Sequence, residues 1–248
     1  MPTYRFPRPS VTVDAVVFGI DIVLRKLYVL LIRRGGQPYR GQLALPGGFI
    51  DMRESLEDAV RRELHEETAI GTYDPNCDLK PDIYLEQLYT FGDPPRDPRG
   101  RVISVAYYAL VDSTKYGNIV GGSDATESLW EPLPLQDEKG RPLKLAFDHN
   151  RVLDTALRRL RSKIRYAPVG FELLPERFTM TQLRTVYEVI LGRHLDRSNF
   201  AKKIWATGVL RCAGTMRGMS NRPAQLYRIN KKVFDDRVAN GFASEVCR

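Results

Sequence analysis

Short apolar segments separated by turns fill the first part of the chain. Their β-branched and aromatic residues, grouped over strand-length stretches, are typical of a sheet. Five segments predict strands: "VTVDAVVFGI" at 11–20, "KLYVLLIRR" at 26–34, "DIYLEQLYTFG" at 82–92, "VISVAYYALV" at 102–111 and "SLWEPL" at 128–133. The intervening segment 35–48, "GGQPYRGQLALPGG", is rich in glycine and proline and predicts a loop.

Helical spacing of apolar residues replaces this strand pattern in two places. Leu56, Val60 and Leu64 recur at helical spacing after Ser55, which is a suitable N-cap. The segment "LKLAFDHNRVLDTALRRLRSKI", 143–164, predicts an amphipathic helix, with apolar residues at 145, 152, 153, 157, 160 and 164. Strands combined with at least two helices predict an α+β fold for this part of the chain.

A proline-rich segment, "APVGFELLPERF", marks a boundary that predicts two domains, 1–166 and 167–248. The elements expected after it are a helix at 179–191 capped by Thr179 or Thr181 and stopped at Gly192, a helix at 198–208 capped by Ser198, and strands at 209–214 and 224–230. Helix, turn, helix and a two-stranded ribbon with a basic tip is the plan of a winged helix-turn-helix.

Charge is distributed unevenly between these two parts. The formal net charge is +8, and residues 167–248 contain 14 Lys and Arg but 7 Asp and Glu. Between 193 and 232 there are ten basic residues and one acid, Asp196. Solubility alone would explain a modest excess, whereas this local density favours a polyanionic partner.

Composition places the chain among soluble globular proteins, with 43% hydrophobic and 27% charged residues. No apolar run has the length of a membrane span, and the N-terminal segment lacks the apolar core of a signal peptide, so no membrane partner is expected. Cys77, Cys212 and Cys247 are odd in number and lack metal-ligand spacing. A reducing, cytoplasmic setting is the simplest interpretation.

Acidic residues concentrate in the segment 47–70, "GGFIDMRESLEDAVRRELHEETAI". On a helix, Glu63, Glu66 and Glu67 converge on one side, where like charges repel unless a cation joins them. Oxygen-only ligands suit Mg²⁺. Spacing alone leaves a solvated acidic helix face as the other interpretation. An ion pair between Arg62 and Glu54 would fix the local geometry.

The same segment resembles the Nudix signature. Gly48, Glu54, the run Arg62-Glu63-Leu64, the pair Glu66-Glu67 and the apolar Ile70 match it at every charged position over 23 residues. The one departure is Ala69, where the family has glycine. Since glycine ends the helix there, we expect Gly71 to take over the C-cap.

The resemblance implies an N-terminal Nudix α/β/α sandwich that acts on nucleoside diphosphates linked to another group. Its catalytic set would be Glu54, Arg62, Glu63, Glu66 and Glu67. Glu63, Glu66 and Glu67 would bind Mg²⁺ or Mn²⁺, with a backbone carbonyl near Gly47 assisting. Glu54 and Arg62 would hold the loop and helix in register.

The chain as a whole resembles a family of Nudix-related transcriptional regulators of NAD or sugar metabolism. Such regulators sense ADP-ribose or a phosphorylated sugar and bind a palindromic operator as a homodimer. Candidate ligand contacts are Arg96, Arg99 and Arg101 for a phosphate and Tyr39 or Phe91 for stacking on adenine. The alternative for the three arginines is that they are solvated loop charges. The alternative for the two aromatic rings is that they belong to the core.

The winged helix would place its second helix in the major groove of double-stranded DNA. Candidate DNA contacts are Arg197, Ser198, Asn199, Lys202 and Lys203 around that helix, with Arg217 and Arg222 in the wing. Asparagine and arginine side chains suit base edges, while lysines suit phosphates. A winged helix that mediates protein contacts is the alternative.

Two hypotheses of different class follow. The first is a ligand-responsive transcriptional regulator, which the basic C-terminal part favours. The second is a Mg²⁺-dependent pyrophosphatase of the ADP-ribose type with an accessory basic domain, which the intact set of glutamates favours. A regulator that also hydrolyses its effector would combine them.

Overall fold

The computed structural model describes residues 6–71, 83–112, 115–116, 128–216 and 223–240. It divides into two compact units. The first comprises 1–18, 28–110 and 120–156, and the second 19–27, 111–119 and 157–248. No helix among the described residues has the length and hydropathy that a membrane span requires.

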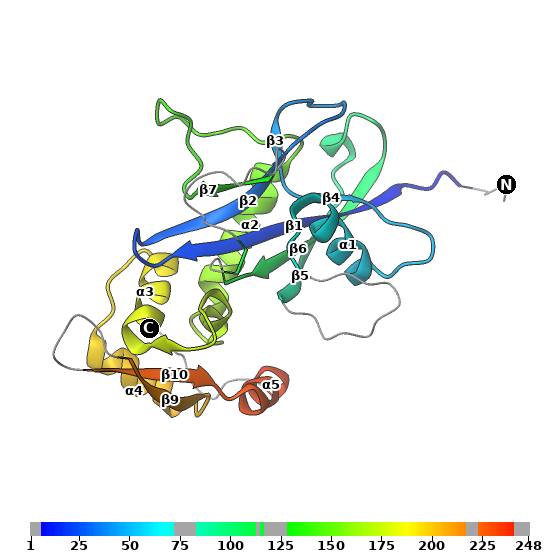
Figure 1. The fold of residues 1–248 in the computed structure, drawn as a ribbon. Helices are drawn as coiled ribbons and strands as arrows, with labels where there is room; N and C mark the ends of the chain where they lie inside the picture. Colours follow the sequence, from blue (N-terminus) through cyan, green and yellow to red (C-terminus); the bar gives the residue numbers. More distant parts are fainter. Residues whose placement is uncertain (1–5, 72–82, 113–114, 117–127, 217–222, 241–248) are drawn as a thin grey trace. The chain divides into compact units, whose positions relative to one another are not determined.

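A seven-stranded sheet forms the first unit (Figure 1). Its strands are β1 (Ser10–Asp21), β2 (Lys26–Arg33), β3 (Leu43–Ala44), β4 (Gly47–Phe49), β5 (Tyr84–Phe91), β6 (Val102–Leu110) and β7 (Ser128–Pro132). The main path runs β3-β2-β1-β6-β5, while β4 pairs with β1 and β7 with β2. The central pair, β1 and β6, is parallel. All five strands expected in this part are therefore present.

Both faces of this sheet are covered. Residues 13–20 of β1 are buried without interruption, although alternate side chains point to opposite faces. The covering helices are α1 (Leu56–Thr68) and α2 (His149–Lys163), and a 3-10 turn, η1 (Pro94–Arg96), precedes β6. This is the predicted α/β/α sandwich.

Two local expectations for this unit are wrong. The loop predicted at 35–48 contains two short strands, β3 and β4, because its apolar residues pair with β2 and β1. Helix α2 begins at His149 instead of near 143, so Leu145 precedes the helix, where its side chain is buried. Periodicity alone did not distinguish these residues from the helix proper.

The ends of α1 follow local capping chemistry. Ser55 caps the start, where its side chain accepts a hydrogen bond from the Asp58 amide at 3.1 Å. At the other end, Ala69 adopts the left-handed conformation with φ 55° and donates to the His65 carbonyl. The expectation that Gly71 takes over the C-cap is therefore wrong, because the alanine keeps the position of the signature glycine.

A non-glycine residue in the left-handed region costs about 1 kcal/mol. Ala69→Gly is therefore expected to raise the free energy of unfolding by about that amount. The same change at Ala59, inside α1, is expected to lower it by about 1 kcal/mol. Urea unfolding curves of both variants test this, and equal signs for the two changes would contradict it.

The second unit contains the winged helix. Its elements are η2 (Val169–Leu173), β8 (Phe178–Thr179), α3 (Met180–Leu191), α4 (Arg197–Ala206), β9 (Leu210–Met216), β10 (Ala224–Ile229) and α5 (Lys231–Asn240). The strands form a sheet in the order β8-β10-β9. Strand β8 and helix α5 add to the predicted plan of two helices and two strands.

Capping decides where both helices of this module begin. Thr179 and Gln182 form a reciprocal capping box at α3, which ends at Gly192 as expected. Helix α4 is capped by Asp196, whose side chain accepts from the Asn199 amide at 2.7 Å. The prediction that Ser198 caps it is wrong, and Arg197 is its first residue rather than a flanking one.

Candidate functional site

Arg62 organises the carboxylates of α1. Its guanidinium donates to both oxygens of Glu54, at 3.0 and 2.8 Å, so the predicted ion pair is present. The same side chain contacts Glu63 at 2.8 Å and Glu66 at 3.2 Å. Glu54, eight residues before Arg62, thereby ties the loop preceding α1 to its middle. Glu66 is the outermost of the group, with 57% of its side chain exposed.

Two glycines let the backbone of β4 approach these carboxylates. A Cβ atom on Gly48 would lie 2.3 Å from Oε1 of Glu63, closer than any side chain permits. Gly47 has φ 151° and its amide donates to Oε2 of Glu67 at 2.8 Å. The Gly-Gly pair is therefore needed for close contact between strand and helix.

Burial and the contacts of Arg62 shift the pKa values of these acids in opposite directions. Desolvation, with a smaller contribution from the neighbouring charge of Glu63, raises the pKa of Glu67 to about 7 against the opposing hydrogen bond from Gly47. Burial also raises the pKa of Glu63. Hydrogen bonds from Arg62 lower the pKa of Glu54. The inner end of the cluster is thus short of positive charge.

The donor set fits a divalent cation. Glu63, Glu66 and Glu67 offer carboxylate oxygens from one helix face, and a cation would favour the charged form of Glu67, which burial disfavours. No three acidic, His or Cys side chains in the described ranges already surround one position. Arg62 lies between Glu63 and Glu66 instead, so ion binding requires these side chains to turn away from it.

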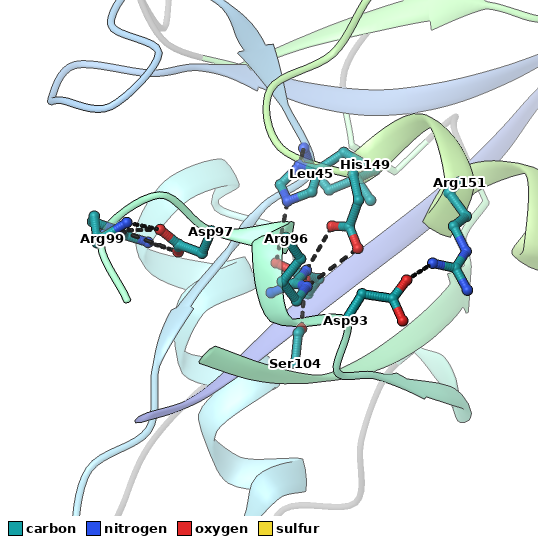
Figure 2. A network of polar contacts seen from close by, with 10 residues as sticks. Leu45, Asp93, Arg96, Asp97, Arg99, Ser104, His149 and Arg151 are labelled. Atoms are coloured by element: carbon teal, nitrogen blue, oxygen red, sulfur yellow. Dashed lines mark hydrogen bonds and ion pairs between the residues drawn. The ribbon is translucent and has the colours of Figure 1, made fainter. Parts of the chain in front are cut away.

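Arg96 lies in a second, buried network of polar contacts (Figure 2). Its guanidinium contacts Asp148 at 2.8 Å and Asp14 at 3.2 Å, and its side chain is 4% exposed. The Ser104 hydroxyl also donates to Asp14. His149 accepts from the Leu45 amide at 2.9 Å through Nδ1, and burial lowers its pKa.

The other residues predicted to contact a ligand do not all lie in this network. Arg99 forms a two-pronged ion pair with Asp97, and Arg101 donates to the Gly92 carbonyl at 2.6 Å. Phe91 is 3% exposed, which fits the core interpretation, whereas Tyr39 is 37% exposed and packs edge-on against Phe147 at 4.9 Å. Arg96 is committed to its two aspartates.

Sequence reasoning missed several residues in this region. Asp14 lies within β1, Arg34 directly follows β2, and Phe147 lies just before α2. Neither the charge of Arg34 nor the aromatic ring of Phe147 forms part of a periodic pattern that would indicate a site. Charge within an otherwise apolar strand, as at Asp14, was the one available indication of a buried ionic partner.

Helix α4 presents a polar face in the second unit. Phe200 and Ile204 are buried, while Ser198, Asn199 and Lys202 are exposed and Lys203 is half-buried. Trp205, which the sequence reading did not select, is 43% exposed on the same face, with its ring edge-on to Tyr227 of β10 at 5.4 Å.

Buried Glu188 fixes the loop that leads into α4. It accepts from Arg25 at 2.6 Å, from Arg184 at 3.1 Å and from the Leu195 amide at 3.0 Å. Arg25 belongs to the segment 19–27, which groups with this unit. The candidate wing contacts Arg217 and Arg222 lie outside the described residues.

Comparison with known proteins identifies both parts. Residues 9–156 match the model of the NUDIX domain, and residues 170–229 match that of the NrtR DNA-binding winged helix domain. Nudix hydrolases as a class use divalent metal ions, in keeping with the carboxylates of α1.

Three similar proteins illustrate the relationship. The "ADPR responsive transcriptional repressor NtrR" of Acinetobacter baylyi is 35% identical over 232 residues, 93% of this chain and 86% of the relative. A crystal structure of Shewanella oneidensis NrtR complexed with a 27mer DNA is 35% identical, covers 95% of this chain and 98% of that one, and superposes with a TM-score of 0.77. An ADP-ribose pyrophosphatase of Methanocaldococcus jannaschii is 35% identical over 156 residues, 62% of this chain and 78% of the relative. Since the similarity extends across both units, the chain belongs to the family of Nudix proteins that carry an NrtR DNA-binding winged helix domain.

Proposed function

We propose that this protein is a transcriptional repressor whose Nudix domain binds ADP-ribose and whose winged helix binds a double-stranded DNA operator. The exposed polar face of α4 carries this proposal. It lies in a domain of the NrtR DNA-binding type, and a relative of nearly full length is named as an ADPR responsive repressor. A regulator of this kind works in the cytoplasm, where its operator is accessible.

DNA binding would use α4 as the recognition helix in the major groove. Asn199 suits an adenine edge, and Lys202 and Lys203 suit phosphates. Ser198 and Arg197, in the first turn of α4, lie where recognition helices meet base edges or backbone. The basic wing residues Arg217 and Arg222 would add phosphate or minor-groove contacts.

Trp205 offers a direct test of this interface. Its exposed ring shares the face of Ser198 and Lys202, so we expect operator DNA to change its fluorescence. In a Trp130→Phe background Trp205 is the one tryptophan left in the chain. Trp205→Ala is expected to weaken operator binding by about tenfold, the loss of roughly 1–2 kcal/mol of apolar contact. Unchanged fluorescence and affinity would place the DNA on another face.

Repression would respond to ligand through a homodimer, in which ADP-ribose changes the spacing of two winged helices. Coupling of this kind requires ADP-ribose to bind the DNA-free state more tightly than the DNA-bound state.

The decisive experiment is a gel shift with the DNA upstream of the protein's own gene, with and without ADP-ribose. Binding should fall steeply with salt, because cationic side chains displace counterions from phosphates. ADP-ribose should release the DNA, whereas AMP should not. A shift that persists after removal of residues 170–248 would refute the assignment of the winged helix.

A second candidate function, hydrolysis of ADP-ribose, is favoured by the complete set of carboxylates on α1. Glu63, Glu66 and Glu67 would hold Mg²⁺, which when bound supplies charge stabilisation for a diphosphate and acidifies a water molecule. Glu54 and Arg62 would hold the loop and helix in place. AMP release from ADP-ribose should be lost in Glu66→Gln; release equal to that of wild type would rule out this chemistry.

A further inference from the structure

Two guanidinium groups converge on one aromatic ring in the first unit. The Cζ atom of Arg34 lies 4.6 Å from the centroid of Phe147, and that of Arg99 lies 5.4 Å from it. Arg99 also lies 5.0 Å from the ring centroid of Phe49. The Tyr39 ring meets Phe147 edge-on at 4.9 Å. Two like charges thus share one ring face or edge within cation–π range.

Phe147 is held in a rare backbone conformation. Its φ is 53°, in the left-handed region that bulky residues avoid, and it packs against a small buried cluster of Ile32, Ala44 and Ala146. Residues in such conformations persist where the surroundings determine them, and they concentrate at ligand sites. The ring is therefore fixed in place before any ligand arrives.

The charge of Arg34 has acidic side chains nearby but no direct ion pair in the described residues. Arg99 is paired with Asp97 through two contacts, at 3.0 and 2.7 Å. Arg34, by contrast, makes no ion pair within the described part of the chain, and its Nε donates to the Pro38 carbonyl at 2.9 Å. Partial burial, and then the charge of Arg99, lower the pKa of Arg34. A half-buried cation beside a second cation is a site that an anion would stabilise.

This cationic cluster lies next to the carboxylates of α1. The Phe49 ring, whose centroid lies 5.0 Å from Arg99, belongs to β4, and Gly47 of the same strand donates to Glu67 at 2.8 Å. An anion held by Arg34 therefore has the guanidinium groups on one side and divalent-ion ligands on the other. A group with several negative charges satisfies both sides, whereas a single carboxylate does not.

We propose that Arg34, with Arg99 stacked on Phe147, binds the diphosphate of the effector. This inference rests on the proposed function, since it names the residues that recognise the charged part of ADP-ribose. The planar guanidinium of Arg34 donates to phosphate oxygens, and the Phe147 ring keeps it in the orientation needed. Arg96, which the sequence suggested for this role, is paired with Asp14 and Asp148 instead.

The test is isothermal titration with three probes in Mg²⁺ buffer: ADP-ribose, inorganic pyrophosphate and adenosine. Arg34→Met should weaken binding of ADP-ribose and pyrophosphate by about 10- to 100-fold, the effect of losing a charge-assisted contact. Adenosine should bind as it does to wild type. Arg34→Lys keeps the charge but not the planar fork, and should fall between the two. Arg40→Met removes an exposed charge from the same loop and should change nothing beyond twofold.

Each outcome decides the inference. If Arg34→Met binds both anions within twofold of wild type, or loses all three probes equally, Arg34 does not recognise the diphosphate. Pyrophosphate binding that depends on Arg34, without ADP-ribose binding, would keep the inference and overturn the proposed effector. A wild-type protein that binds neither anion would overturn both.

Discussion

Replacing Arg96 by methionine is expected to lower the free energy of unfolding of the first unit by about 3–5 kcal/mol. Methionine fills a similar volume but leaves the carboxylates of Asp14 and Asp148 without their cation. Both acids are mostly shielded from water, so their charge would be poorly compensated. Urea unfolding followed by Trp130 fluorescence, in a Trp205→Phe background, measures the loss.

A surface pair provides the matched control. Arg151 contacts Asp93 through the same pair of groups, but both side chains are 57% exposed (Figure 2). Arg151→Met is therefore expected to unfold at the urea concentration of wild type, because solvent screens such pairs. Equal shifts for Arg96→Met and Arg151→Met would mean that burial adds nothing to the network. Adding Asp14→Asn to Arg96→Met should recover part of the loss by removing one unpaired charge.

The buried network also bears on the ligand site. Asp14 of β1 pairs with Gly47 of β4 in the sheet register, and Gly47 donates to Glu67. A displacement of Asp14 would therefore shift Gly47, and with it the hydrogen bond that Gly47 donates to Glu67. For this reason Arg96→Met should weaken ADP-ribose binding even though Arg96 contacts no ligand in our proposal.

Local chemistry made much of this fold predictable from sequence. The five strands expected in the first unit are present, because their apolar runs are long enough to distinguish strand from loop. The cap at Ser55 depends on residues a few positions apart, as does the Arg62–Glu54 pair, which spans eight residues. The Nudix-type spacing therefore fixed the acidic face of α1 before any three-dimensional information.

Long-range partners could not be read in this way. Arg96 meets Asp14 across 82 residues and Asp148 across 52, so its commitment to a buried network is invisible in the loop sequence that suggested a ligand contact. The positive φ of Phe147 likewise has no local signal. The Asp196 cap is different: aspartate is as good an N-cap as serine, and starting two residues earlier would have found it.

Mg²⁺ binding by the α1 carboxylates is expected to depend on the proton held by Glu67, whose pKa is raised to about 7. A carboxylate must lose its proton before it ligates a metal. The apparent affinity for Mg²⁺ should therefore rise about tenfold per pH unit up to pH 7 and level off above it. Titration in two buffers of different ionisation enthalpy should show close to one proton released at pH 6.

Without metal, the proton on Glu67 makes the free energy of unfolding fall with pH, whereas the affinity for Mg²⁺ rises with pH. Between pH 4.5 and 7 the folded chain keeps a proton on Glu67 that the unfolded chain has lost, so the free energy of unfolding should fall as the pH rises through this range. Glu67→Gln should abolish this fall and the pH dependence of Mg²⁺ affinity. Glu66→Gln should weaken Mg²⁺ binding yet keep its pH dependence, because Glu67 is still present. An unaltered pH profile in Glu67→Gln would assign the proton to another residue, and Glu63, whose pKa burial also raises, would then be the one to replace.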